Sequence, residues 1–132
     1  MFMKKEIGPW CIVLLYDIEQ IIQNVHKEDI QLAKKYLRTA AVFKHVSELD
    51  GYQLVEYVDI RLRVKMELLR SVDAPIASIG QMVRVLSGSA QGKSAEVCHL
   101  TWHFNKQKII YTLKVEEKIL SREYFAEDIC PL

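Results

Sequence analysis

The sequence predicts an α+β protein that is mainly β. Residues 1–75 are expected to form a helical hairpin with a small antiparallel β unit, and residues 76–132 a five-stranded barrel. Three observations predict this arrangement. Apolar residues follow a helical period only between residues 17 and 37, and short apolar runs separated by turn residues fill most of the remaining chain. A stretch of small residues with one proline, 73–78, has the composition of a linker between the two parts.

The N-terminal part begins with an apolar run, 11–16, which is long enough for a buried strand and too short for a helix. Asp17 is expected to cap a short helix, because Gln20 occupies the capping-box position three residues later. Apolar residues then recur at i, i+3, i+4 and i+7, which predicts a short amphipathic helix with one apolar stripe: Ile18, Ile21, Ile22 and Val25. A second helix is expected over residues 28–37, with acidic residues in its first turn and basic residues near its end, as the helix dipole favours.

From residue 39 the pattern becomes that of strands. Asp50-Gly51 predicts a turn between strands at 40–46 and 52–57. In the next strand, 60–64, apolar residues alternate with cations, which puts Arg61, Arg63 and Lys65 on one face. These cations are candidate binding residues for an acidic partner. The alternative is a solvated face whose charges pair with neighbours such as Glu56.

The C-terminal part reads as five short strands with one helical turn before the last. The strands are expected at 82–86, 95–104, 108–115, 118–121 and 129–132, the second of them bent or bulged, with the turn at 122–128. Segments between residues 52 and 72 follow the same order of strands and turn as segments between 109 and 132. The hypothesis that follows is a tandem barrel repeat, with residues 39–72 as a second, degenerate copy.

A glycine-punctuated loop connects the first two of these strands. The stretch Val83-Arg-Val-Leu-Ser-Gly88, with Gly92 and Val97 after it, resembles the KOW motif of NusG-type transcription factors and several ribosomal proteins, although Ala95 stands where a third glycine is common. The resemblance implies an SH3-like barrel whose loop contacts RNA or protein, with Arg84 and Lys93 as the nearest cations. Gly88 and Gly92 themselves suit a turn that needs positive φ. The segment 102–111 also resembles uncharacterised bacterial small-barrel proteins.

Charge and cysteine content exclude several classes of protein. The formal net charge of +1 predicts only weak attraction to nucleic acid or to an anionic membrane. Cys11, Cys98 and Cys130 form no close pair, which argues against a disulfide framework or a metal motif and favours a reducing compartment. His99 and His103 would lie roughly 13 Å apart on a strand, at about 3.3 Å per residue, so they could not share one ion. We therefore expect no cofactor and no metal.

The sequence lacks the motifs of several enzyme classes, so binding is the predicted function. The sequence has no GxSxG elbow and no complete phosphate loop, and its N-terminal apolar run lacks the features of a signal peptide. No segment is long enough to span a bilayer, so a cytoplasmic protein is expected. Aromatic residues gather between positions 102 and 125, and most of them are expected in the core of so small a barrel. Trp102 and Tyr124 are the candidates for an exposed partner surface.

We accordingly predict a non-catalytic small-barrel interaction module that binds protein. The alternatives are a KOW-like factor associated with RNA or the ribosome, and a small enzyme. The sequence predicts neither the partner's identity nor the oligomeric state.

Overall fold

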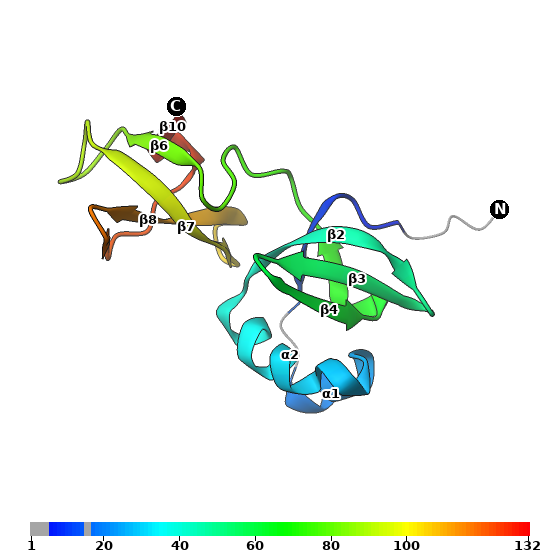
Figure 1. Ribbon diagram of the computed structural model, residues 1–132. Helices are drawn as coiled ribbons and strands as arrows, with labels where there is room; N and C mark the ends of the chain where they lie inside the picture. Colours follow the sequence, from blue (N-terminus) through cyan, green and yellow to red (C-terminus); the bar gives the residue numbers. More distant parts are fainter. Residues whose placement is uncertain (1–5, 15–16) are drawn as a thin grey trace. The chain divides into compact units, whose positions relative to one another are not determined.

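The computed structural model describes residues 6–14 and 17–132 (Figure 1). The chain divides into two compact units, Met1–Ala74 (unit 1) and Pro75–Leu132 (unit 2). The part of the chain that the structure describes is mainly β, with 45% strand and 20% helix in two antiparallel sheets and two α-helices. The α+β, mainly β class expected from the sequence is therefore confirmed at this level.

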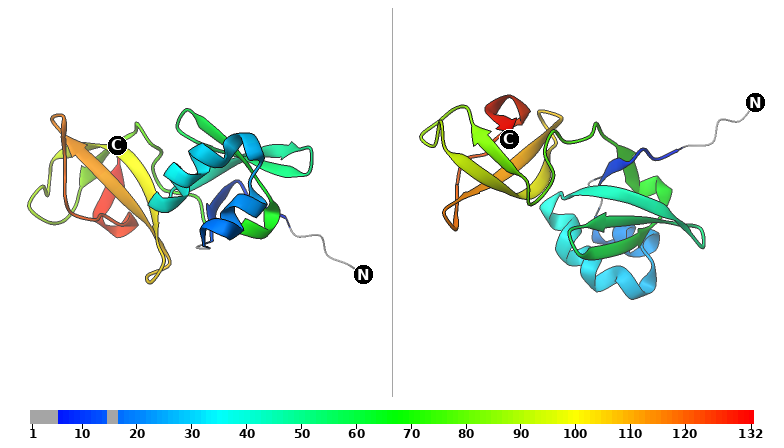
Figure 2. Two further views of the ribbon diagram at one scale, coloured as in Figure 1. Left: turned by 90° about the horizontal axis from the view of Figure 1, so that it is seen from below. Right: turned by 45° about the horizontal axis from the view of Figure 1, so that its top comes forward.

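Unit 1 contains a five-stranded sheet in the order β4-β3-β2-β1-β5. Its strands are β1 (Trp10–Val13), β2 (Val42–Leu49), β3 (Tyr52–Tyr57), β4 (Ile60–Val64) and β5 (Leu69–Ser71). The connection from β1 to β2 is a helical insert of α1 (Ile18–Asn24), η1 (Lys27–Asp29), α2 (Ile30–Tyr36) and η2 (Leu37–Thr39). A single 3₁₀ turn, η3 (Met66–Leu68), precedes β5. In Figure 1 and in the right-hand view of Figure 2 the helices of the insert lie together on one side of this sheet.

The helical insert differs in three ways from the sequence expectation. The apolar stripe expected on the first helix is largely uncovered, since Ile18 and Ile22 are each 42% exposed and α1 contains no buried residue. The Asp17 side chain caps α1 as predicted, since it accepts a hydrogen bond from the Gln20 N–H at 2.9 Å. Val25, however, is not on the helical stripe: it is extended and forms an antiparallel bridge with Val64. The bonds beside this bridge, from the His26 N–H to the Arg63 carbonyl at 2.9 Å and from the Lys65 N–H to the Asn24 carbonyl at 2.8 Å, pair the backbone after α1 with β4. The second helix begins at Ile30, because the three residues before it form a 3₁₀ turn.

The position of β1 is the larger correction. The sequence predicted a buried strand at 11–16 and a helical hairpin with a small antiparallel β unit, but it gave the strand no partner. In the structure β1 lies inside the sheet, paired with both β2 and β5. Its buried residues Cys11, Ile12 and Val13 are thus part of the core. The apolar run was predicted to continue to residue 16, and residues 15 and 16 lie outside the described residues.

Unit 2 contains a second five-stranded sheet in the order β10-β6-β7-β8-β9. Its strands are β6 (Met82–Val85), β7 (Ser94–His103), β8 (Lys108–Val115), β9 (Lys118–Ile119) and β10 (Ile129–Pro131), with the 3₁₀ turn η4 (Ala126–Asp128) before β10. The register of β7 on β8 shifts between Val97 and His99, which confirms the bulge expected in this long strand. The order has β9 and β10 at its two edges, so the sheet is not a closed barrel.

The two sheets have the same strand order and the same 3₁₀ turn before the last strand. Their registers also correspond, since β2 and β7 both carry a register shift at the same distance from their first pairing. The pairing makes these positions equivalent: Trp10 and Met82, Lys44 and Glu96, Glu56 and Lys114, Tyr57 and Val115. The main difference is the connection between the first two strands, which spans residues 14–41 in unit 1 and only residues 86–93 in unit 2.

Candidate functional site

The short connection between β6 and β7 is a loop closed at its base by backbone hydrogen bonds. The Gly92 N–H donates to the Val85 carbonyl at 2.8 Å, and the Val85 N–H donates to the Lys93 carbonyl at 2.9 Å. Gly88 and Gly92 have φ of 82° and 87°, the left-handed conformation that glycine adopts without a steric penalty. The glycines thus let the chain reverse within a few residues, as their spacing indicates.

Gly88 has a second role, which is to make room for Arg122. A Cβ at position 88 would collide with the Arg122 guanidinium. Arg122 Nη2 donates to Ser87 Oγ at 3.3 Å, and Ser87 Oγ donates to Asp128 Oδ1 at 2.7 Å. These bonds fasten the start of the loop to η4.

Asp128 is the anchor of this network. Its Oδ2 accepts a hydrogen bond from the Phe125 N–H at 2.9 Å. That bond, then the Ser87 hydroxyl and the Arg122 charge, outweigh burial and lower the pKa of the Asp128 carboxyl. The sequence did not predict this network, because Ser87 lies far from Arg122 and Asp128 in the chain and the three residues belong to no motif.

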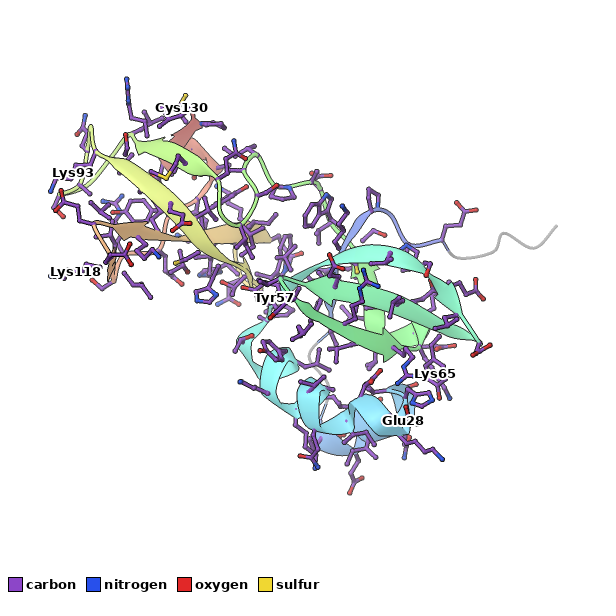
Figure 3. The ribbon with its side chains drawn as sticks, viewed as in Figure 1. Glu28, Tyr57, Lys65, Lys93, Lys118 and Cys130 are labelled. Carbon is purple, nitrogen blue, oxygen red and sulfur yellow. The ribbon has the colours of Figure 1, made fainter. Side chains whose placement is uncertain are left out.

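Beside the loop, the tip of the β8–β9 hairpin forms one wall of a pocket of about 300 Å³. The pocket is lined by Ala90, Lys93, Val115, Glu116, Lys118 and Leu120. Val115 is half-buried and lies on the same face of β8 as the core residue Leu113, so the apolar part of the pocket continues the core. Figure 3 shows Lys93 and Lys118 at the same end of unit 2.

The two lysines of the pocket differ from their neighbours in their charge environment. Within residues 6–14 and 17–132, neither the Lys93 nor the Lys118 ammonium group forms an ion pair. Lys114, in contrast, pairs with Glu96 at 3.1 Å. The pocket therefore combines three apolar lining residues and one carboxylate, Glu116, with two ammonium groups that can meet a carboxylate or a phosphate of a ligand. Of the candidate residues, Lys93 lines it, while Arg84 lies exposed on β6 and does not.

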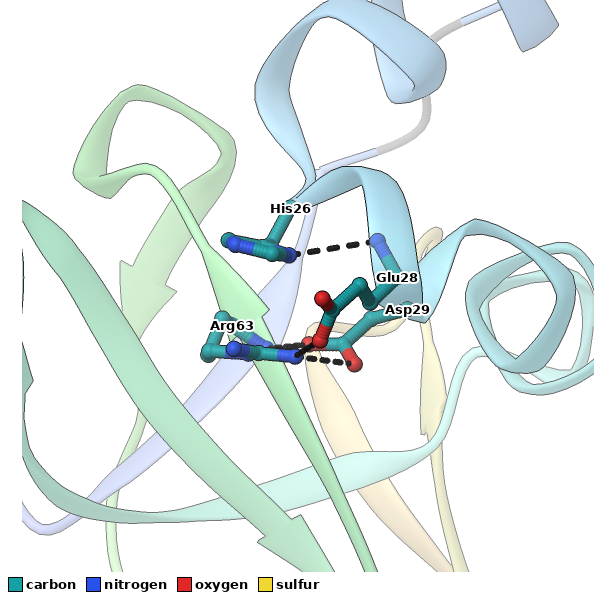
Figure 4. Close-up of polar contacts among 4 residues, drawn as sticks. All are labelled: His26, Glu28, Asp29 and Arg63. Carbon is teal, nitrogen blue, oxygen red and sulfur yellow. Dashed lines mark hydrogen bonds and ion pairs between the residues drawn. The ribbon is translucent and has the colours of Figure 1, made fainter.

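The cationic strand of unit 1 is engaged in the fold. Arg63 binds Asp29 through two parallel contacts, Nε to Oδ2 at 2.9 Å and Nη2 to Oδ1 at 3.0 Å (Figure 4). Its backbone N–H also donates to Asp29 Oδ2 at 2.8 Å, and Nη2 reaches Glu28 at 3.2 Å. Burial would raise the pKa of the Asp29 carboxyl, but the hydrogen bonds and charge of Arg63 lower it below its usual value. Arg63 therefore attaches the helical insert to β4.

The other two cations of that strand remain at the surface. Arg61 pairs with Glu56 at 2.9 Å, which is the solvated pairing that the sequence offered as the alternative to a docking surface. Lys65 is exposed beside η3. The three cations do not form one continuous docking face, because Arg63 turns toward the insert.

A family model described as "Family of unknown function (DUF6960)" matches residues 3–130. The chain belongs to this family. The match extends over both units and includes the loop and the pocket. No curated protein matches the chain.

The aromatic candidates of this DUF6960 protein occupy different environments. Trp102 is half-buried near the end of β7. Tyr124 is only 2% exposed, and its backbone bridges Tyr111, so its ring belongs to the core of unit 2. Arg122 lies over that ring at 5.4 Å. The Tyr124 ring thus packs against the Arg122 guanidinium and is too buried to contact a partner protein.

Two of the cysteine thiols of the DUF6960 protein are at least partly buried. Burial raises the pKa of the Cys11 thiol to about 12 and also raises the pKa of Cys98, whose Sγ donates to the Thr112 carbonyl at 3.2 Å. Thiols held in the protonated state are poor nucleophiles. Among the described residues no group of three or more His, Cys, Asp or Glu side chains could hold a metal ion. None of the described helices has the length and apolarity needed to cross a membrane.

Proposed function

We propose that this DUF6960 protein is a non-catalytic interaction module that binds another protein through the pocket beside its glycine loop. One observation carries the proposal: a pocket with an apolar part continuous with the core is also lined by two lysines that have no ion pair among the described residues. A concave apolar site with a few charged groups at its rim is a common form of binding site. The lack of neutralising partners leaves these charges for a ligand.

The state of the reactive side chains supports binding without chemistry. The thiols of Cys11 and Cys98 have raised pKa values, and the carboxyls of Asp29 and Asp128 are held by structural hydrogen bonds. A catalytic nucleophile or base usually has a pKa adjusted toward its task and lies in a cleft. Neither condition is met by these four groups.

For the fold of unit 2 we propose an SH3-like barrel of the KOW type, and for the whole chain a tandem repeat of it. The shared strand order, with a 3₁₀ turn before the last strand, supports both parts of this proposal. The backbone bridge between Tyr111 and Tyr124 adds support, because it brings the chain back along β8 before β10 begins. Such a return path would curl the sheet toward closure.

Site-specific photocrosslinking tests the proposed function. A benzophenone amino acid at Glu116, in the pocket, should give a protein adduct in cells that naturally express the chain. The same amino acid at Lys106, in the β7–β8 loop outside the pocket, is the matched control. The adduct should disappear when Lys93→Glu and Lys118→Glu are combined. Equal adducts at both positions, or none at Glu116, would contradict the proposal.

The same experiment distinguishes the RNA-associated alternative. The two lysines beside a KOW-like loop are also suited to phosphate groups. An adduct at Glu116 that is sensitive to ribonuclease, with no protein adduct, would favour the RNA-associated factor over the protein-binding module.

A further inference from the structure

The third strands of the two units, β3 and β8, each carry a residue at the same position on the face toward the core. The two units differ in what covers that residue. In unit 1 this position is Tyr57, which is 7% exposed and lies 6.3 Å, centroid to centroid, from the ring of Tyr36 in α2. In unit 2 it is Val115, which is half-buried and lines the pocket. The helical insert of unit 1 thus covers the position that the shorter loop of unit 2 leaves open.

From this equivalence we infer that the pocket of unit 2 binds a helical turn of a partner protein, with an aromatic side chain on Val115 and acidic residues beside it. The inference rests on the proposed function and specifies its ligand. Unit 1 shows the covering arrangement within the same chain: Ala33 and Leu37 of the insert are buried on one stripe, and Tyr36 between them reaches Tyr57. An amphipathic helix in a groove is a recurring mode of peptide recognition.

The size of the pocket agrees with such a ligand. A cavity of about 300 Å³ is at the small end of the range for ligand pockets, and it suits one large side chain. Ala90, buried at one wall, adds no bulk that would exclude an aromatic ring. An aromatic anchor in an apolar pocket is also the contact that contributes most to many protein interfaces.

Charge determines which residues must flank that anchor. In the insert of unit 1, Lys34 and Lys35 directly precede Tyr36. Lysines at those places would be repelled by Lys93 and Lys118, which outnumber the single carboxylate of the pocket, Glu116. A ligand of unit 2 therefore needs carboxylates where the insert has lysines.

The insert of unit 1 supplies the sequence of a peptide probe for the pocket. A fluorescein-labelled peptide of residues 28–39 with Lys34→Glu and Lys35→Glu should bind the full chain saturably in fluorescence anisotropy. Its dissociation constant should rise by about five- to tenfold when the peptide also carries Tyr36→Ala. The same rise is expected when the protein carries Lys93→Glu with Lys118→Glu, since each exposed charge pair contributes modestly. The peptide with its original lysines should bind more weakly than the acidic peptide.

Lys106→Glu is the matched control, because it reverses a charge in unit 2 outside the pocket and should leave the dissociation constant unchanged. Circular dichroism checks that the variants fold as the parent does. The inference is overturned if the acidic peptide does not bind, if it binds the pocket variant equally well, or if a uridine homopolymer binds through the two lysines in its place. A pocket crosslink from Glu116 to a protein would in those cases still support the proposed function, so the two can fail separately.

Discussion

Replacing Asp29 with alanine should release the helical insert of unit 1 from its sheet. The Asp29 carboxylate is the acceptor for three Arg63 donors, at 2.8, 2.9 and 3.0 Å, and Asp29 is 8% exposed. Removing one partner of a buried ion pair costs about 3–5 kcal/mol. The Arg63 side chain is 26% exposed, so water recovers part of this loss and we expect about 2–3 kcal/mol. Asp29→Asn keeps an oxygen acceptor and should cost about 1–2 kcal/mol.

The chain provides its own reporters for this measurement, since it has two tryptophans, Trp10 in unit 1 and Trp102 in unit 2. Urea unfolding followed by fluorescence in Trp102→Phe and Trp10→Phe backgrounds reads each unit separately. Asp29→Ala should lower the unfolding free energy reported by Trp10 and leave that reported by Trp102 unchanged. Glu28→Ala is the control, because that carboxylate is 67% exposed and should matter by less than about 0.5 kcal/mol. A loss at Asp29 no larger than at Glu28 would refute the reasoning.

The effect of pH provides an independent check on Asp29. Its pKa is lower in the folded protein than in the unfolded chain. The stability that its ionised form contributes is therefore fully present above the unfolded pKa and is lost as the pH falls through the folded pKa. The difference in unfolding free energy between the parent and Asp29→Asn should shrink over that acidic interval. A difference that stays constant with pH would show that the charge is not the cause.

Three further predictions concern single positions. Gly88→Ala should destabilise unit 2 by about 1–2 kcal/mol, more than Gly92→Ala, because only the Cβ at position 88 meets the Arg122 guanidinium; equal losses would contradict this. Val58→Asn should stabilise unit 1 by up to about 1 kcal/mol in thermal unfolding, because Val58 is 59% exposed with φ of 56°; destabilisation would contradict it. Asp128→Asn should destabilise unit 2 at neutral pH, and the deficit should fade as acid protonates the parent carboxyl; a deficit that persists would exclude charge as its origin.

Features that depend on adjacent residues could be predicted from the sequence. The cap at Asp17 formed, and Asp50 and Gly51 have the positive φ values of 51° and 82° that a tight hairpin needs. The turn at Gly88 and Gly92 also formed where their spacing indicated. These features follow from the conformational preferences of a few neighbouring residues, which a sequence displays directly.

Features that depend on distant pairing could not be predicted. Alternation correctly placed Arg63 on the polar side of its strand, but it could not show that Asp29, from a helical connection, would meet it. In the same way, the pocket exists because the loop before β7 is too short to cover Val115, and a sequence pattern does not show which connection covers which face. The sequence identified Lys93 as a candidate binding residue because it follows a glycine motif. It did not identify Lys118, which belongs to no motif.

Protection of the sheet edge is the simplest alternative explanation for the lysine of β9. Natural proteins often place lysines on edge strands to prevent pairing with other chains, and Lys118 lies on such a strand. Two observations argue that this is not its whole role. The adjacent Ile119 is 55% exposed, which leaves an apolar residue on the same short edge, and Lys93 lies in a loop where no edge needs protection. Because both lysines line one pocket, a shared ligand accounts for the pair, whereas edge protection accounts for one of them.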